Sequence, residues 1–369
     1  KKYTGEKMTN TTVLSKRIKI KPAWSFYDEH GEYVDPRLFV LLNAIHKYGK
    51  LTAAATQLGM SYRHVWNVLK KWTDFFGSDL VELKKGKGAL LTPLGEKLLW
   101  AEQRAHARFE PQLISIASEL NLEIQKHLMV KEPLLKIAAS YGYAVALLPD
   151  FTNKFKLDLQ YKSYEESWVA LTNGECNVAA FHLPTDIVNQ TLIDTYNKYF
   201  KANTYKVIRF VTRKQGLIVK KDNPRNITKI TDLMQDEVKF VNRQKHSGTR
   251  LLIDELLARS SVDPEEVIGF ENVEFTHSAI AAYVASGMAD VGVGIETAAR
   301  QFGLDFIPLT TEHYVLVCHH KTLKNPAVQR LITEIKSDRF HEEVSKLAGY
   351  ESITCGDIVD LEDMLPWQV

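Results

Sequence analysis

The fold of the N-terminal part is decided by residues 49–66, which read GKLTAAATQLGMSYRHVW. Thr52 is placed to cap a short helix, and Gly59 then provides a residue that tolerates the turn after it. Ser61 is placed to cap a second helix that we expect to continue to about Phe76. Two short helices joined by a glycine-containing turn are typical of a helix-turn-helix, whose second helix is free to enter a major groove.

The sequence on both sides of this unit extends it. Residues 18–34 alternate in polarity around a turn at 28–31, which predicts a β-hairpin, and Asp35-Pro36 is placed to start a helix before the unit. Residues 80–91 predict two short strands around a basic glycine tip, the arrangement called a wing. The pattern therefore predicts a winged helix-turn-helix over residues 18–92.

A long helix is predicted to follow, over residues 93–130. Thr92-Pro93 caps it, and Pro111 is expected to kink or break it. Its apolar residues recur every three or four positions, as in a coiled-coil seam. They are Leu94, Leu98, Ala101, Ala105, Phe109, Leu113, Ile116 and Leu120. We expect this linker helix to mediate a homodimer or a tetramer, because the seam otherwise stays exposed.

Residues 131–369 change to short apolar strands that alternate with helical segments, which is typical of parallel sheets covered by helices. Residues 207–219 are expected to form a strand pair that crosses to a second lobe, and residues 313–318 to form the return. The predicted strands are 134–139, 157–161, 178–181, 240–241 and 291–295. The chain is thus predicted to be a multidomain α+β protein with a C-terminal two-lobed α/β domain.

Charge is concentrated in the N-terminal part. Residues 35–110 contain twelve Lys or Arg against seven Asp or Glu, whereas the whole chain has a formal charge of +2. A local excess of this sign is what neutralisation of DNA phosphates requires. The residues that we expect to contact DNA are Ser61, Tyr62, Arg63, His64 and Asn67 of the second helix, with Lys84, Lys85 and Lys87 of the wing.

Within that second helix, Arg63 is suited to guanine and Asn67 to adenine. Val65, Trp66, Val68 and Leu69 are expected to face the core instead. Each polar side chain taken singly is equally typical of an ordinary surface, so the DNA-binding prediction rests on their combination.

Residues 41–66, together with Leu80-Val81-Glu82 and residues 91–95, resemble the N-terminal domain of ModE-type molybdate regulators and the LysR-type winged helix. The resemblance covers about residues 18–120 and implies a DNA-binding transcription regulator. Residues 134 to about 350 resemble a periplasmic-binding-protein-like (type 2) domain of the variant that accompanies molybdenum-related regulators. The ModE-type effector module is instead a small β-barrel. The resemblance of the DNA-binding domain therefore does not identify the ligand of the C-terminal domain.

The expected effector site lies between the two lobes. Ser247-Gly248-Thr249-Arg250 opens a helix whose free N–H groups and positive dipole end face the cleft, and Ser140-Tyr141-Gly142 is expected to repeat this in the other lobe. The predicted ligand-binding residues are Ser140, Tyr141, His182, Arg243, Ser247, Gly248, Thr249, Arg250, His277 and Glu296. We expect a tetrahedral oxyanion, molybdate or tungstate first, or a molybdenum-cofactor compound, between Ser140-Tyr141 and Ser247-Thr249-Arg250.

Composition excludes several other classes. The three cysteines are widely spaced and odd in number, so no disulfide framework or metal site is expected, and a reducing cytoplasm fits. No apolar run approaches the roughly 18 residues that a membrane-spanning helix needs. The chain starts at Lys1 rather than Met, and about the first ten residues are left out of the fold prediction. No catalytic residue, metal or cofactor is predicted.

Three alternatives stay open at this level. An enzyme would use a cleft histidine with Cys176 or Cys318 as a nucleophile and base, but no triad spacing supports it. A transport receptor is opposed by the fused winged helix and by the lack of a signal segment. A LysR-like regulator of a small organic acid keeps the regulatory function and changes only the ligand.

Overall fold

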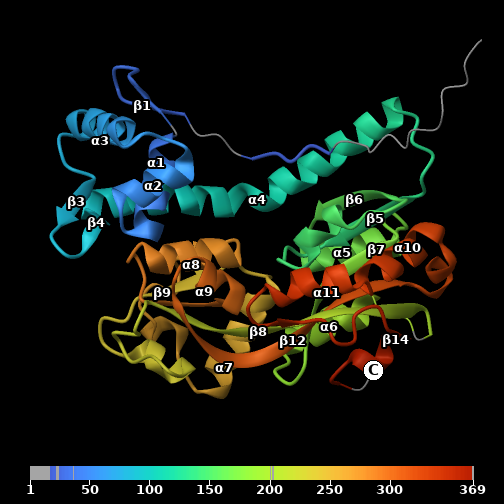
Figure 1. Cartoon of the computed structure of the whole chain (residues 1–369). Coiled ribbons are helices and arrows are strands. Elements are labelled where there is room, and N and C mark those ends of the chain that lie inside the picture. Colours follow the sequence, from blue (N-terminus) through green and yellow to red (C-terminus); the bar gives the residue numbers. More distant parts are fainter. Residues whose placement is uncertain (1–16, 22–24, 36, 200, 202, 368–369) are drawn as a thin grey trace, which may run out of the picture.

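The computed structural model describes residues 17–21, 25–35, 37–199, 201 and 203–367. Three parts follow one another along the chain: a small N-terminal lobe, one long helix and a large domain built on a single sheet (Figure 1). The N-terminal lobe sits at one end of the long helix, which runs across both halves of the large domain. The predicted multidomain α+β class is confirmed.

The N-terminal lobe is a winged helix-turn-helix. Its elements are β1 (Phe26–Tyr27), β2 (Tyr33–Val34), α1 (Arg37–Tyr48), α2 (Leu51–Leu58), α3 (Tyr62–Phe76), β3 (Val81–Lys84) and β4 (Gly88–Leu91). Gly59 ends α2 with a φ of 63°, and the Ser61 hydroxyl accepts a hydrogen bond from the N–H of His64 at 3.1 Å. Its core consists of Leu38, Leu41, Leu42, Ile45, Leu51, Val65, Leu69 and Trp72.

The wing closes against the end of α1. The N–H of Ala89 donates to the carbonyl oxygen of Gly49 at 2.8 Å. A Cβ atom at Gly88 would lie only 2.1 Å from that same oxygen, so glycine is required for this close approach.

One prediction in this lobe is wrong, and the predicted hairpin is present but shorter than expected. Lys50 holds the cap position of α2, so Thr52 lies inside the helix and does not cap it. The hairpin is limited to two residues in each strand. Residues 17–21 do not pair with it, because the side-chain amide of Asn121 satisfies both the N–H and the carbonyl of Ile18 at 2.8 Å each.

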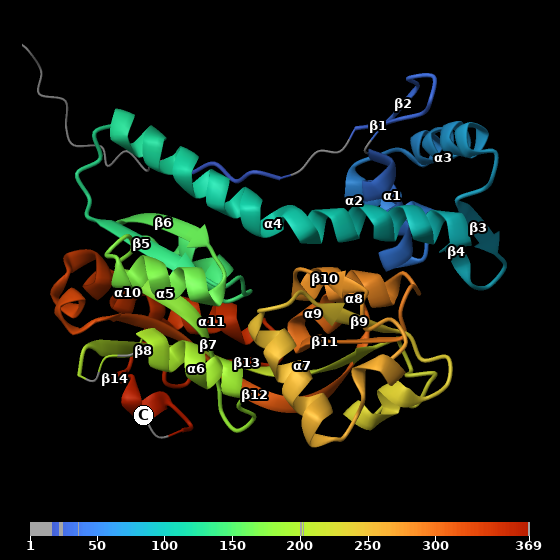
Figure 2. The ribbon, with the colours of Figure 1, turned by 180° about the vertical axis from the view of Figure 1, so that it is seen from behind.

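The long helix α4 (Pro93–His127) is continuous over 35 residues. The Thr92 hydroxyl caps it by accepting from the N–H of Gly95 at 3.2 Å. Pro111 does not break the helix, and α4 changes direction in its middle part (Figure 2). Because proline has no N–H, the carbonyl of Ala107 loses its helical donor. The hydroxyl of Thr276, in the large domain, donates to that carbonyl at 3.0 Å instead.

In the described part of the chain, one mixed sheet of ten strands joins the two lobes of the large domain. Its order is β10 (Val273–Glu274), β9 (Phe240–Arg243), β11 (Val291–Ile295), β8 (Tyr205–Val219), β12 (Asp305–His319), β7 (Val178–Pro184), β5 (Leu134–Ala139) and β6 (Lys156–Tyr161), with β13 (Tyr350–Glu351) and β14 (Ile358–Asp360) also on β8. The two central strands, β8 (Tyr205–Val219) and β12 (Asp305–His319), are antiparallel and run through both lobes. Each of the segments predicted at 207–219 and 313–318 is therefore part of a single 15-residue strand. Most of β8 is buried, and in β12 the buried residues lie in the second part of the strand, from Glu312 to Cys318.

Lobe 1 lies on one side of these strands. It contains β5 (Leu134–Ala139), β6 (Lys156–Tyr161), β7 (Val178–Pro184), α5 (Tyr164–Thr172), α6 (Gln190–Tyr199), α10 (Pro326–Ile335), α11 (Asp338–Ser345), β13 (Tyr350–Glu351) and β14 (Ile358–Asp360). Lobe 2 contains β9 (Phe240–Arg243), α7 (Gly248–Arg259), β10 (Val273–Glu274), α8 (His277–Ala285), β11 (Val291–Ile295) and α9 (Glu296–Gln301). In each lobe the outer strands are parallel, as predicted.

Candidate functional site

The reading face of the N-terminal lobe is the start of α3. Ser61, Tyr62, Arg63, His64 and Asn67 are all exposed there, as predicted. Trp66 is also exposed, at 40%, and packs edge to face on Tyr62 with the ring centres 6.2 Å apart. The expectation that Trp66 faces the core is therefore wrong, because Val65, Leu69 and Trp72 already fill that side of α3.

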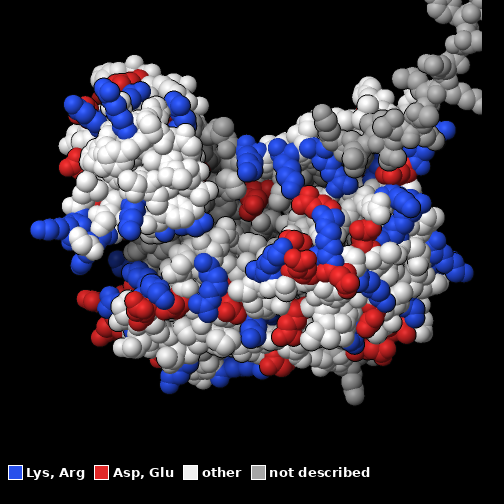
Figure 3. Space-filling model, in the orientation of Figure 1, with Lys and Arg blue, Asp and Glu red and all other residues white. Residues whose placement is uncertain are grey.

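The wing lies beside this helix. Lys84, Lys85 and Lys87 are exposed, and Lys84 is paired with Glu82 at 3.0 Å. A shallow groove lies between the wing, the start of α2 and Tyr62 of α3. It is lined by Lys50, Leu51, Thr52, Tyr62, Leu83, Lys84, Lys85, Gly86, Gly88 and Ala89. Lys and Arg side chains project from this lobe (Figure 3). A basic groove of this shape is suited to a DNA backbone.

Not all the positive charge counted in residues 35–110 lies on the reading face. Arg104 and Arg108, on α4, both pair with Glu274 of lobe 2, and Arg108 does so at 3.2 Å. These two arginines therefore belong to the contact between the helix and the large domain.

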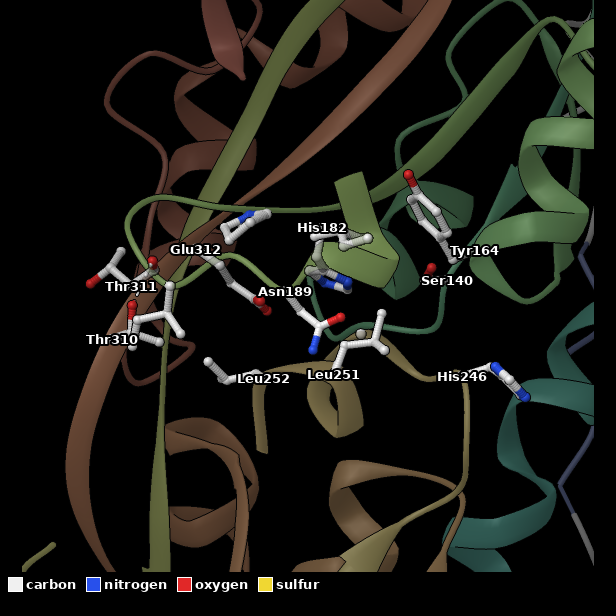
Figure 4. Close-up of a pocket in the computed structure, with 14 residues that line it drawn as sticks. Ser140, Tyr164, His182, Asn189, His246, Leu251, Leu252, Thr310, Thr311 and Glu312 are labelled. Atoms are coloured by element: carbon white, nitrogen blue, oxygen red, sulfur yellow. Dashed lines mark hydrogen bonds between the residues drawn. The ribbon is translucent and has the colours of Figure 1, made fainter. Parts of the chain in front are cut away.

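A cleft lies between the two lobes, where strand ends and helix starts converge. Eight of the ten predicted ligand-binding residues line it: Ser140, Tyr141, His182, Arg243, Ser247, Gly248, Thr249 and His277. The cleft continues into a smaller pocket beside Ser140, His182 and Glu312 (Figure 4). The geometry thus brings together residues that follow β5 with residues of β7, β9, α7 and α8.

Two predicted residues lie elsewhere. Arg250 turns along its own helix, where its Nε donates to Asp254 at 2.8 Å and its guanidinium stacks on Phe270. Glu296 accepts from Arg300 at 3.1 Å on α9 and does not line the cleft. In both cases the side chain forms an ion pair with a residue four positions further along its helix, Asp254 for Arg250 and Arg300 for Glu296.

The predicted second helix start is also wrong. The chain after β5 forms no α-helix, and only a six-residue 3₁₀ turn (Val145–Asp150) follows. Ser140 is held by its backbone, since the Tyr314 hydroxyl donates to its carbonyl at 2.6 Å. The hydroxyl of Tyr141 donates to Glu110 of α4 at 2.8 Å. The helix start that lines the cleft in lobe 1 is therefore not at Ser140-Tyr141 but at Ser163 and Tyr164, where α5 begins.

Two buried arginines dominate the electrostatics of the cleft. Arg213, on β8, donates through Nε to Glu312 at 2.6 Å, and its buried Nη1 has no partner among the described residues. Arg243 is 7% exposed and contacts His277, Gln244 and the carbonyl of Phe275, with no carboxylate within ion-pair distance in the described part of the chain. Burial and the nearby Arg213 lower the pKa of Arg243 to about 9.

The two cleft histidines are neutral. Burial, followed by the charges of Arg213 and Arg243, holds the pKa of His182 and of His277 well below the ordinary value. The Nε2 atom of His182 is buried and has no hydrogen-bond partner among the described residues. This atom and Nη1 of Arg213 are polar groups that a ligand is able to satisfy.

Arg213 is the main site residue that the sequence reasoning missed. Its signal was present, because Arg213 and Gln215 are polar residues that stand at alternate positions between the apolar Val211 and Leu217 of one strand. A charged side chain in that register marks a buried charge that needs a partner. Tyr161 and Tyr164, which add aromatic surface to the cleft, were also missed.

The cysteines do not support an enzyme. Burial raises the pKa of Cys176 to about 11 and that of Cys318 and Cys355 to about 12, so each is a thiol rather than a nucleophilic thiolate. Within the described residues, no group of His, Cys, Asp and Glu is arranged to hold a metal ion. No described helix has the length and apolar character that crossing a membrane demands.

Comparison with known families agrees with this arrangement. Residues 147–336, more than half of the chain, match the family described as PBP superfamily domain. Residues 36–96 match the bacterial regulatory helix-turn-helix protein of the lysR family. The chain therefore belongs to the PBP superfamily, and its residues 36–96 are similar to the helix-turn-helix of lysR-family regulatory proteins.

Individual relatives cover parts of the chain. The uncharacterized protein YvgK of Bacillus subtilis is 33% identical over 201 residues, which are 54% of this chain and 64% of YvgK, so less than two thirds of that relative is spanned. An uncharacterized protein in the ferredoxin 2Fe-2S gene 5' region of Clostridium pasteurianum is 36% identical over 30% of this chain and 97% of its own length. The molybdenum transport protein ModE of Herbaspirillum seropedicae is 33% identical over 27% of this chain and 36% of its length.

Among solved structures, CbnR, a LysR family transcriptional regulator, aligns over 81% of this chain and 99% of its own chain. The TM-score is 0.39 and the sequence identity is 15%.

Proposed function

We propose that the protein regulates transcription in the cytoplasm by binding double-stranded DNA through α3 and the wing, and that a small anion in the cleft controls it. The first candidate is a dianionic tetrahedral oxyanion, molybdate or tungstate. This candidate keeps the predicted cleft but replaces Arg250 by Arg243 and Arg213 as the cations that meet the anion.

The charge balance of the cleft carries this proposal. Arg213 and Arg243 are both buried, and among the described residues the ion pair of Glu312 is with Arg213. An isolated buried cation is costly unless it is paired, and an anion between the lobes would pair it. In the described part of the chain, Nη1 of Arg213, a buried donor, and Nε2 of His182, a buried ring nitrogen, have no hydrogen-bond partner. Charge-assisted hydrogen bonds to an oxyanion are the strong kind.

The names of two partial relatives favour molybdenum oxyanions among possible anions. ModE is the relative given above, and MopB of Rhodobacter capsulatus, a molybdenum-pterin-binding protein, is 36% identical over 22% of this chain. These names describe those proteins, and they support our choice of the first ligands to test.

A second candidate ligand is a larger planar anion, either a molybdenum-cofactor compound or a small aromatic acid. The observation that favours it is the aromatic surface of the cleft, to which Tyr141, Tyr161, Tyr164 and Phe275 contribute. Rings of this kind stack on planar ligands, whereas a tetrahedral oxyanion leaves them unused.

Calorimetry with the full chain tests the proposal. We expect saturable binding of tungstate or molybdate, and we expect Arg243→Gln to weaken it by about 10- to 100-fold, because a hydrogen bond to a charged group contributes about 1.5–3 kcal/mol. Arg259→Gln is the matched control, because Arg259 is exposed at the far end of α7 and pairs with Glu255 at 2.7 Å.

Sulfate, phosphate, benzoate and a pterin compound complete the series. Binding of only the planar compounds would favour the second candidate. If no anion binds, or if Arg243→Gln and Arg259→Gln behave alike, the cleft is not an anion site.

A further inference from the structure

The helix α4 is attached to both lobes of the large domain (Figure 2). Its second half contacts lobe 1, where the hydroxyls of Ser115 and Ser118 accept from the backbone N–H groups of Tyr161 and Leu159 at 3.0 and 2.8 Å. These two side chains thus provide acceptors for backbone N–H groups at the edge strand β6. The first half contacts lobe 2 through the Ala107 carbonyl, which Pro111 leaves without a helical donor.

A buried carboxylate anchors the lobe 2 contact. Glu274, at the end of β10, is 0% exposed and pairs with Arg104 and Arg108 of α4. The guanidinium of Arg104 also stacks on Tyr283, and that of Arg108 on Phe275. One carboxylate thus holds two guanidinium groups, so one of them is available to a second anion without leaving Glu274 unpaired.

The two arginines differ in where they stand. Arg108 lines the cleft together with Pro111 and Gln112, whereas Arg104 does not line it. Arg108 also stacks on Phe275, and the carbonyl of Phe275 accepts from Nη2 of Arg243 at 3.2 Å. Arg108 therefore contacts the ring of Phe275, and the buried cation Arg243 contacts the carbonyl of the same residue.

We propose that Arg108 is a third arginine of the anion site, supplied by the helix that carries the reading head. When the anion binds, Arg108 turns from Glu274 to the anion, and Arg104 continues to neutralise Glu274. This inference rests on the proposed function, since it assumes an anion in the cleft. It assigns to α4 a direct contact with the ligand.

Ligand binding is thereby coupled through α4 to the position of the DNA-binding lobe. The contact of α4 with lobe 2 changes with occupancy, while the serine contacts with lobe 1 do not involve the ligand. Pro111 lies between these two attachment points and is the place where the helix accommodates a change in direction. The reading head, at the start of α4, then moves relative to lobe 1.

Calorimetry of tungstate binding to three full-length proteins tests this: the wild type, Arg108→Gln and Arg104→Gln. Both variants remove one of the two ion pairs of Glu274, so they are matched in that respect. We expect Arg108→Gln to weaken tungstate binding about tenfold or more and Arg104→Gln to change it less than about twofold. The DNA affinity of Arg108→Gln should also respond less to tungstate than that of Arg104→Gln.

Equal losses in both variants, or no loss in Arg108→Gln, would overturn the inference while leaving Arg243-dependent binding intact. Absence of tungstate binding to the wild type would overturn the proposed function and this inference together. If a Gln variant fails to fold, Arg108→Lys and Arg104→Lys are compared in the same way, because lysine keeps the charge and loses the forked geometry of arginine.

Discussion

Arg243 is the residue whose surroundings say most about the cleft. It is buried, its pKa is lowered by burial and by Arg213, and its neighbours offer a carbonyl, an amide and an imidazole rather than a carboxylate. A fold that retains such a group gives up stability, and a ligand that pairs with it restores part of that stability. The proposed effector site depends on this positive charge, which is buried and unpaired among the described residues.

Burial and the positive charges of Arg213 and Arg243 also predict a pH dependence of stability, because they act on His182 and His277. The folded-state pKa of His182 and His277 lies below the ordinary value of about 6.5, so below that pH the unfolded chain binds more protons than the folded chain. Stability is therefore fully present above about pH 6.5 and decreases as the pH falls, by at most about 1.4 kcal/mol per pH unit for each histidine.

Urea denaturation at pH 7.5 and pH 5.5 measures this change. The double variant His182→Gln, His277→Gln should lose most of the decrease, and tungstate should reduce it in the wild type because an anion raises the pKa of both histidines. An equal acid sensitivity of the wild type and the double variant would contradict the assignment of neutral buried imidazoles.

Residue types at strand ends and helix starts were enough to find eight cleft residues, but long side chains were harder to place. Arg250 lies in the first turn after the Ser247 cap, a position typical of anion-binding residues, yet its guanidinium donates to Asp254 one turn later. Arg213 lies far from any strand end, and its position in the cleft depends on how β8 passes between the lobes. Such pairings depend on tertiary distances that a local pattern does not contain.

At the scale of elements, α3 and the wing form the reading head. The helix-turn-helix was predictable because its turn chemistry is local: Gly59 and Ser61 set the geometry by themselves. The prediction that Trp66 faces the core was wrong, because Val65, Leu69 and Trp72 already form the buried face of α3. Its exposure beside Tyr62 adds an apolar contact to a face that is otherwise polar.

Variants of α3 should change the preference among DNA sequences, whereas variants of the wing should change the affinity for every duplex. Arg63→Ala should reduce the preference among duplexes by about 1–3 kcal/mol, and the triple variant of Lys84, Lys85 and Lys87 to alanine should weaken binding to every duplex and flatten the salt dependence. Fluorescence anisotropy with selected and unrelated duplexes at several salt concentrations measures both. Lys321→Ala, an exposed lysine of the large domain, is the control.

Unchanged binding in both the Arg63 variant and the triple lysine variant would refute the placement of DNA on this face. A salt slope that the lysine variant leaves unaltered would show that the wing does not contact phosphates.

At the scale of the whole molecule, α4 connects the reading head to both lobes, and part of its apolar seam stays at the surface. Leu98 packs into the N-terminal core and Leu113 lines a groove against lobe 1, so these two seam residues serve the chain's own fold. Ile116 and Leu120 are 51% and 42% exposed. The seam was predictable from its spacing, but its division between internal and external contacts was not, because that depends on where the large domain docks.

We expect Ile116 and Leu120 to lie in a homodimer contact, since exposed apolar side chains on one helix face mark interaction sites. The double variant Ile116→Asp, Leu120→Asp should shift the protein from dimer to monomer in light scattering at micromolar concentration. Glu119→Ala, on the same stretch of α4, should leave the mass unchanged. A wild-type monomer, or a dimer that persists in the double variant, would contradict this contact.

The central claim is that an anion in the cleft controls DNA binding. The most direct measurement is the affinity of the full-length protein for a duplex that it selects from random sequence, with and without saturating tungstate or molybdate. The account predicts a change of at least about fivefold, in either direction, which corresponds to about 1 kcal/mol of coupling and is lost in Arg243→Gln. Tungstate that binds without altering DNA affinity, or an equal change in the Arg243→Gln protein, would contradict it.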